Sequence, residues 1–408
     1  MTDRSTPWAI VALLSATATA GYICRVNAST AGLLIMKEFA LSQPAMGRIF
    51  SAFLFGYALF QIPGGALADR QGARRTLLLA AWLWVAVTAA QALVGWGPLT
   101  GSTLSAMSLL LFLRFLMGIV AAPTYPAAAQ GVSRWVAPAY RGRANGIVIA
   151  SIGLGSAIAS PLVSATMVRW GWRSALLVSA LPALAAALIW LKVSEPLGLP
   201  VNPPARKPEA PTRDPRLKSS LRTPAFAFLT ASYTLQGYVG YIFVFWFYLY
   251  LVQERHFDLL SGAWVNSMSW VLSIVSIPLG GFVSDRLASG PLGQIWGSRA
   301  VPMAGMAASG VLISIGAHTQ SPVTAAIALA LATACVLSVE GPFWAMMIRL
   351  AGPGSGTAGG IMNMGCNLGG LISPALTPLL ASYIGWENAL HLAAGFAIVA
   401  AALWLRIK

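Results

Sequence analysis

Charged residues are scarce in this sequence: Asp, Glu, Lys and Arg together make up 9% of its 408 residues, whereas apolar residues make up 57%. A water-soluble globular protein of this length needs far more polar surface to cover its core. The composition therefore excludes an ordinary soluble domain. It predicts an all-α integral membrane protein, because the apolar runs are long and do not alternate as the strands of a membrane barrel do.

Cysteine is also rare, with Cys24, Cys335 and Cys366 as the three positions. Each lies in an apolar stretch without the paired spacing of metal motifs, so we expect no metal, no other cofactor and no disulfide framework. The sequence also shows no nucleophile paired with a base and no phosphate-binding loop ahead of a soluble helix. We therefore expect that the protein is not an enzyme.

Apolar runs of about 20 residues predict helices that cross a bilayer, and the sequence contains about twelve such runs. They are residues 8–34, 45–67, 75–96, 104–128, 144–168, 174–194, 225–252, 261–284, 300–318, 322–348, 356–382 and 387–405. The first run also resembles a signal peptide, with a cleavage site at Ala16–Ala20. Cleavage there would remove half of the first span, so we interpret the run as a transmembrane helix.

The net charge of +15 could suggest nucleic-acid binding, so the placement of the 26 Lys and Arg residues matters. Arg25 and Arg114 fall inside spans. If the N-terminus is cytoplasmic, 19 of the other 24 cations fall in cytoplasmic segments. The external ones are Lys37, Arg48, Arg169, Arg173 and Arg255. This asymmetry follows the positive-inside rule. We predict a protein of the cell inner (plasma) membrane with both termini in the cytoplasm and no nucleic-acid partner.

A charged motif occurs twice, about half the chain apart. Gly64-Gly65 precedes Asp69-Arg70, and Gly280-Gly281 precedes Asp285-Arg286 at the same spacing. Weaker echoes are Ser160-Pro161 with Ser373-Pro374, and Gly171-Trp172 with Gly385-Trp386. Such repeats predict duplicated membrane-spanning halves. We place them at residues 1–194 and 224–408, joined by the proline-rich, basic cytoplasmic linker 195–223.

Three ionisable side chains inside spans are candidate functional residues, because burying a charge in a membrane is costly. Arg25 in the first span could grip a carboxylate with its planar fork, although it could also snorkel or form a structural ion pair. Arg114 in the fourth span fits a structural role equally well. Glu340 could carry a proton, or it could be a permanent partner of Arg25 or Arg114. The adjacent Gly341-Pro342 should interrupt its helix.

Polar and aromatic residues in several spans could bind a hydroxylated ligand, although each of them alone more often joins neighbouring helices by packing or hydrogen bonds. They are Tyr57 and Gln61 in the second span, Tyr125 in the fourth, Tyr233, Gln236, Tyr238 and Tyr241 in the seventh, and Asn363 and Asn367 in the eleventh. Together they predict a polar cavity between the halves.

We interpret residues 65–75 as a loop between two spans. This loop resembles the signature between the second and third helices of the major facilitator superfamily, and Gly281–Arg286 resembles its echo in the second half. The resemblance covers essentially the whole chain. It implies the major facilitator fold, with about twelve transmembrane helices in two pseudo-symmetric six-helix bundles. It also implies a cytoplasmic latch in which Asp69 meets the start of the eleventh span and Asp285 the start of the fifth. The latch residues are Asp69, Arg70, Arg74, Asp285 and Arg286.

Within that superfamily the chain resembles the anion:cation symporter branch, which takes up sugar acids and other organic anions. The matching positions are Tyr22 and Arg25, residues 51–65, residues 114–118 with Ala122-Pro123, Trp246, and residues 359–374. The resemblance implies that Arg25 holds the substrate carboxylate, with Tyr57 and Asn363 lining the site.

The chain departs from that branch at two positions. Many proton-coupled members carry an Asp before the first-span arginine and a Glu before the Ala-Pro of the fourth span, where this chain has Cys24 and Ala121. Either Glu340 has taken over proton coupling, which we favour, or the protein is a facilitator or an exchanger. Residues 160–164 also lack the Gly-Pro pattern that is typical of drug–proton antiporters, which argues against multidrug export.

We therefore predict a monomeric secondary transporter that imports a small, sugar-acid-like organic anion by alternating access, in symport with protons. The predicted substrate-binding residues are Arg25, Tyr22, Tyr57, Gln61, Tyr125, Gln236, Tyr241, Asn363 and Asn367. Two alternatives remain open. One is an exporter, exchanger or facilitator of a small metabolite on the same fold, and the other is a receptor on a transporter scaffold that binds its ligand without flux.

Overall fold

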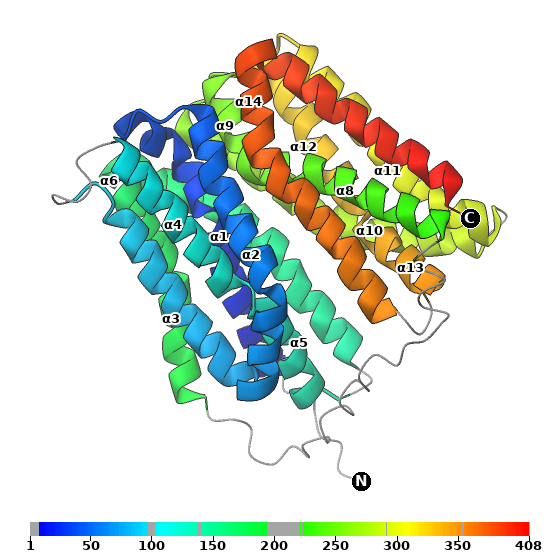
Figure 1. Ribbon diagram of the computed structural model, residues 1–408, viewed down its shortest axis with the longest axis horizontal. Helices are drawn as coiled ribbons and strands as arrows, with labels where there is room; N and C mark the ends of the chain where they lie inside the picture. Colours follow the sequence, from blue (N-terminus) through cyan, green and yellow to red (C-terminus); the bar gives the residue numbers. More distant parts are fainter. Residues whose placement is uncertain are drawn as a thin grey trace. The chain divides into compact units, whose positions relative to one another are not determined.

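A computed structural model describes residues 8–96, 103–137, 140–193, 221, 223–290, 292–351 and 355–407. In these ranges the chain forms helices joined by short turns and bends, with no β-strand (Figure 1). The chain divides into two compact units, which are Met1–Ser42 with Ala52–Ala210, and Gln43–Ser51 with Pro211–Lys408. The predicted linker 195–223 lies almost wholly outside the described residues, so the domain limits stay a prediction.

The first unit is built around α1 and α6. Its helices are α1 (Trp8–Glu38), most of α2 (Gln43–Gln71), α3 (Ala73–Ala92), α4 (Thr103–Ala121), α5 (Thr124–Trp135) and α6 (Arg141–Lys192). α1 and α3 both pack against α6. One buried apolar cluster joins helices of this unit and includes Leu14 of α1, Leu77 of α3, Val132 of α5 and Trp190 of α6. Burial of such side chains fixes how the helices pack inside the unit.

The second unit is built in the same way around α8 and α14. Its helices are α8 (Pro224–Phe245), α9 (Phe247–Gln253), α10 (Leu259–Ala288), α11 (Gly293–His318), α12 (Pro322–Ser338), α13 (Glu340–Ala351), α14 (Ser355–Leu403) and the 3₁₀ turn η4 (Trp404–Arg406). α14 packs against α8 and α11, as α6 packs against α1 and α3 in the first unit. The two units therefore repeat one packing scheme, as the duplicated motif predicts.

All of the predicted apolar runs lie largely within helices. Nine helices of the described chain are long and apolar enough to cross a membrane, or ten if α8 and α9, which meet at 52°, count as one bent span. Two predicted runs are merged in α6 and two more in α14, each time across a glycine with non-helical torsion angles.

Gly171 and Gly385 make the same break in the two units. Gly171 has φ 79° and ψ 168°, and Gly385 has φ 83° and ψ 158°. This region of backbone space is open almost solely to glycine, because a Cβ would clash with the chain's own backbone. The Gly-Trp echo in the sequence therefore marks a backbone requirement that both halves share.

The repeated charged motif is more helical than the sequence suggests. α2 continues through Asp69-Arg70 to Gln71, and the chain turns only at Gly72, which has φ 82°. In the second unit α10 likewise continues through Asp285-Arg286. The interpretation of residues 65–75 as a loop was thus wrong for most of this segment. Charged side chains can extend from the end of a helix into water while the backbone hydrogen bonds of the helix stay intact.

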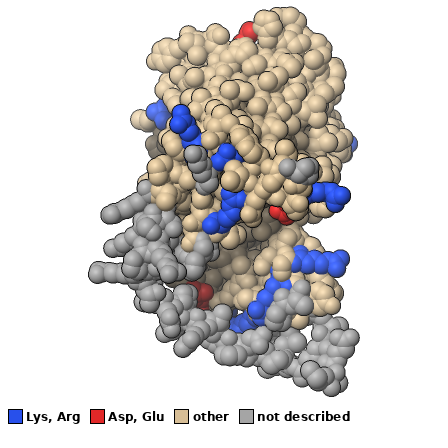
Figure 2. All heavy atoms as spheres, turned by 90° about the vertical axis from the view of Figure 1, so that its right-hand side faces the viewer, with Lys and Arg blue, Asp and Glu red and all other residues tan. Residues whose placement is uncertain are grey.

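Large apolar side chains cover much of the outside of the molecule. Exposed examples from α10 and α12 are Trp264, Val275, Phe282, Val323 and Ile327. On the face that Figure 2 shows, uncharged surface is broad and Lys and Arg lie in a few places only. A surface of this kind is stable against lipid tails, which agrees with helices that span a membrane.

The two glycine breaks generate a stability prediction. Gly171→Ala and Gly385→Ala should each destabilise the protein by about 1–3 kcal/mol, because alanine is strained at these torsion angles. Apart from the local backbone itself, no atom of the described residues lies within 4 Å of a Cβ built at either position, so the loss would come from the backbone alone. Thermal unfolding of the detergent-solubilised protein measures the effect.

The matched control is Gly395→Ala, inside α14 and with equally open space around its Cβ. That change should leave the melting temperature unchanged or raise it, since alanine favours a helix. Equal stability of all three variants would contradict the prediction.

Candidate functional site

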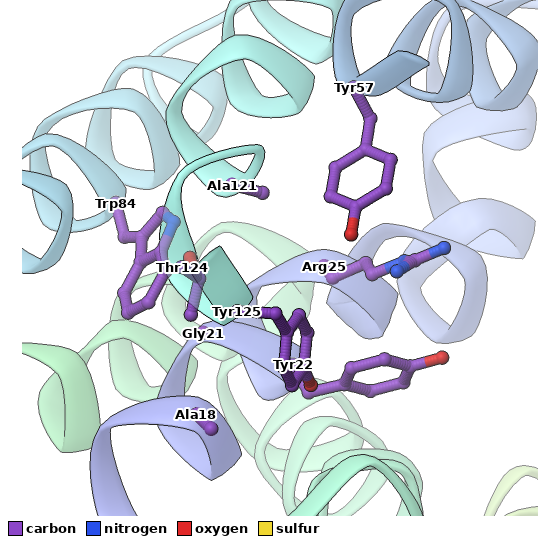
Figure 3. A pocket seen from close by; sticks show the side chains of 9 residues that line it. All are labelled: Ala18, Gly21, Tyr22, Arg25, Tyr57, Trp84, Ala121, Thr124 and Tyr125. Atoms are coloured by element: carbon purple, nitrogen blue, oxygen red, sulfur yellow. The ribbon is translucent and has the colours of Figure 1, made fainter. Parts of the chain in front are cut away.

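A small pocket lies inside the first unit. Its walls come from α1, α2, α3, α4 and α5, and its lining residues are Ala18, Gly21, Tyr22, Arg25, Tyr57, Trp84, Ala121, Thr124 and Tyr125. Figure 3 shows Tyr57 directing its hydroxyl toward Arg25, with Tyr22 and Tyr125 on the opposite side of that side chain. The structure thus brings together four of the predicted substrate-binding residues: Arg25, Tyr22, Tyr57 and Tyr125.

The Arg25 side chain is buried, with 7% of its surface exposed. Its guanidinium lies over three aromatic rings, at 5.0 Å from the ring centre of Tyr22, 5.0 Å from Phe53 and 5.2 Å from Tyr57. Aromatic faces attract cations, more strongly where water is excluded. The snorkelling alternative is therefore wrong, because the side chain points into the unit and lines its pocket.

Arg114 contacts the backbone of Arg25 and is completely buried. Its Nη2 donates a hydrogen bond of 2.8 Å to the Arg25 backbone carbonyl, and its guanidinium lies 5.1 Å from the Phe53 ring centre. Among the described residues, Nε and Nη1 of Arg114 have no hydrogen-bond partner. The hydrogen bond to the backbone agrees with the structural role considered for Arg114, and the side chain places a second positive charge beside the pocket.

The α1 segment that carries Arg25 is anchored to α6 by polar contacts. Asn27 Nδ2 donates to Ser179 Oγ at 2.9 Å, and the hydroxyls of Thr30 and Ser160 are 3.2 Å apart. On the other side, Gly21 leaves room for the Trp84 indole, which would overlap any larger side chain there. The backbone around Arg25 is therefore held between α6 and α3.

In the second unit, Glu340 lies at a helix break, as Gly341-Pro342 predicted. α12 ends at Ser338 and α13 begins at Glu340, so the break precedes Gly341 by a residue or two. The half-buried carboxylate accepts hydrogen bonds from the Tyr233 hydroxyl at 2.7 Å and from Gln236 Nε2 at 2.9 Å. Neutral groups, rather than a cation, hold Glu340 within this unit.

The other predicted residues of the second unit are also placed in helices. Asn363 and Asn367 lie one turn apart on α14, and both are half-buried. Tyr241 stacks on Phe245 with ring centres 6.0 Å apart. In the first unit, Gln61 does not line the pocket but reaches the Tyr57 hydroxyl from one turn further along α2. A role for these residues in binding stays a prediction.

Several residues of the pocket were missed by the sequence reasoning. Trp84 and Thr124 line it, and the Phe53 ring makes cation–π contacts with the guanidiniums of Arg25 and Arg114. Phe53 belongs to a matching motif, which could have pointed to it. Trp84 carried no signal, because its contact with Gly21 joins two spans that no sequence pattern pairs.

The predicted latch residues are mostly exposed. Asp69, Arg70, Asp285 and Arg286 are exposed at the ends of α2 and α10. Arg74 instead donates hydrogen bonds to the carbonyls of Trp190 at 3.2 Å and Leu191 at 3.4 Å. These carbonyls belong to the last turn of α6, so Arg74 caps the C-terminal end of that helix inside the first unit. Arg74 therefore has a role within its own unit, and the latch stays a prediction.

Residues 10–354, most of the chain, match the Major Facilitator Superfamily. The chain belongs to this superfamily. It is a membrane transporter with the major facilitator fold and not an enzyme, as the sequence motifs predicted.

Curated relatives match most of the chain in sequence, and a solved structure matches it in fold. A hexuronate transporter of Bacillus subtilis is 28% identical over 392 residues, which cover 94% of this chain and 90% of the relative. A probable sulfoacetate transporter of Cupriavidus necator is 29% identical over 377 residues, with 89% and 85% covered. The inward-facing, unoccupied structure of a bacterial homologue of the human lysosomal transporter Spinster has a TM-score of 0.81 at 18% identity, with 99% and 97% covered.

The contacts of Phe53 with the guanidiniums of Arg25 and Arg114 lead to a prediction. Phe53→Leu should destabilise this transporter by about 1–3 kcal/mol, since it opens a cavity and removes two cation–π contacts. The control is Phe55→Leu on the same helix, where 51% of the side chain is exposed and a change within about 0.5 kcal/mol is expected. Thermal unfolding in detergent compares them, and a similar loss in both would show that Phe53 has no special role.

Proposed function

We propose that the protein imports a small organic anion, a carboxylate of the sugar-acid type, across the cell inner membrane by alternating access. The observation that supports this most is the buried Arg25 guanidinium in the wall of a pocket rich in tyrosine. A guanidinium can bind a carboxylate through two parallel hydrogen bonds, and tyrosine hydroxyls can bind the hydroxyl groups of a sugar acid.

The charge balance of the first unit supports an anionic substrate. Its described residues include two carboxylates, Glu38 and Asp69. Glu38 accepts hydrogen bonds from Trp172 Nε1 at 2.7 Å and from Arg173, and Asp69 is exposed at the end of α2. Neither lines the pocket, whereas Arg25 does and Arg114 lies beside it. The region is therefore positive and attracts anions.

The size of the pocket supports a mechanism that includes movement. About 250 Å³ of empty space lies between its walls, including space open to solvent. The enclosed part of that space has room for little more than a water molecule. A sugar acid therefore needs additional room, which the movements of an alternating-access cycle can supply.

The relatives support the same class of substrate. Hexuronate carries a carboxylate, and sulfoacetate carries a carboxylate and a sulfonate, so the relatives named for these substrates handle small organic anions. We extend this class, but no individual compound, to the present chain.

Glu340 is our candidate for the proton carrier. It lies at the break between α12 and α13, and its partners Tyr233 and Gln236 are neutral. A carboxylate held by neutral groups can be protonated without breaking an ion pair. It can therefore take up and release a proton as the surroundings change during transport.

Anion exchange is the second candidate function. Cys24 stands beside Arg25, and Ala121 lines the same pocket, so the first unit offers no carboxyl group at these two positions to couple a proton. An exchanger needs no such group, because a second anion balances the returning step. We keep symport through Glu340 as the first proposal.

The orientation and assembly belong to the same proposal. Both termini should be cytoplasmic, because the cations gather in the segments between spans that would then face inside. The protein should act as a monomer, with the charged ends of α2 and α10 forming the cytoplasmic latch.

Arg25→Lys should reduce uptake of a hexuronate into proteoliposomes by about tenfold or more, since a point charge does not replace the planar fork. Arg169→Lys, at an exposed position on α6, is the matched control and should transport normally. Monodisperse elution and an unchanged melting temperature would show that the variants fold. Normal uptake by folded Arg25→Lys would remove Arg25 from the substrate site. Saturable binding without flux by the native protein would favour the receptor alternative.

Glu340→Gln should abolish accumulation driven by a proton gradient but keep exchange of labelled for unlabelled substrate, because glutamine cannot release a proton. Glu254→Gln, exposed after α9, is the control and should keep both activities. The measurement is uptake with an imposed pH gradient beside counterflow without one. Unchanged accumulation would show that another group couples the proton or that the native protein is an exchanger.

A further inference from the structure

Two of the three histidines of the chain meet one carboxylate in the second unit. His318 is the last residue of α11, and Glu387 and His391 lie in α14. His318 Nδ1 is 2.9 Å from Glu387 Oε1, and His391 Nε2 is 3.8 Å from the same oxygen. The transport mechanism above uses none of the three residues.

The three possible ligand atoms form a compact triangle. All of them lie within 4.8 Å of one another. Bonds of about 2.0–2.2 Å from one zinc ion to nitrogen and oxygen ligands place the ligand atoms roughly 3–3.5 Å apart. The three side chains are exposed or half-exposed, with 82%, 52% and 38% of their surface open. They can therefore reach this spacing by small rotations, and an ion can reach them from solvent.

The two backbones that carry these ligands are held firmly. Arg255 donates hydrogen bonds of 2.7 Å to the carbonyls of Gly316, Ala317 and Thr319, so it fixes the end of α11 at His318. In α14 the helix restarts after Gly385, and Trp386 Nε1 donates to Gln43 Oε1 at 3.0 Å.

Glu387 and His391 follow at once and are separated by one helical turn, so they share a face. Ligands fixed on anchored helix ends are preorganised for an ion.

The geometry points to a zinc site formed by His318, Glu387 and His391, which joins the end of α11 to the second half of α14. Two imidazoles and one carboxylate are a ligand set that zinc prefers, with a fourth position open to water. Calcium and magnesium need mostly oxygen ligands, and this cluster offers one carboxylate. In the proposed orientation the site faces the outside of the cell, where an ion could bind without entering the transport path.

Zinc binding to the purified full-length protein tests the site. Isothermal titration in chelator-treated detergent buffer should show one zinc ion per chain, and zinc chloride should raise the melting temperature while magnesium chloride does not. His391→Ala and Glu387→Gln should each weaken zinc binding by about tenfold or more.

The matched controls are His256→Ala, which removes the third histidine, and Cys335→Ser, which removes a partly exposed thiol. Both should bind zinc like the native protein. The melting temperature without zinc shows that each variant folds.

Three results would overturn the proposal: no zinc binding by the native protein, unchanged binding by both ligand variants, or an equal effect of magnesium. Because binding is measured without substrate, failure here leaves the transport proposal untouched.

Discussion

The structure of the first unit depends on one constraint, which is that a permanent positive charge must be stable inside apolar helices. An isolated buried guanidinium costs several kcal/mol. Arg25 is stabilised by three aromatic rings, and its backbone carbonyl receives a hydrogen bond from Arg114. The small residue Gly21, the polar contacts of Asn27 with α6 and the pocket itself are arranged around that charge.

The two units share a backbone plan but differ in their chemistry. Gly171 and Gly385 break corresponding helices with nearly the same torsion angles, and the same pairs of helices pack in both units. The first unit places its buried guanidiniums near the pocket, whereas the second holds Glu340 with neutral hydrogen-bond donors. Duplication thus preserved what the backbone requires and left the polar side chains free to take separate roles. The residues that we propose for substrate binding and for proton coupling therefore lie in different units.

Particular residues show where prediction from sequence succeeds and where it ends. Arg25 and Glu340 could be selected from the sequence alone because an ionisable residue stands out in an apolar run, and their roles in transport stay a prediction. The helix break at Glu340 followed from the adjacent Gly341-Pro342. Trp84 was missed because it is one of many apolar residues in its span. The helical course of α2 through Asp69 was also missed, because a charged segment between spans resembles a loop.

The sequence by itself determined the class of the protein, its apolar spans, its duplicated halves and the superfamily to which it belongs. These properties depend on composition and on spacing along the chain, which tertiary contacts do not change. Only the tertiary structure decided that Arg25 lines a pocket, that Tyr233 and Gln236 hold Glu340, and that His318 meets Glu387. The physical reason is that these contacts join helices far apart in the chain, and their partners are chosen by the packing of whole helix faces.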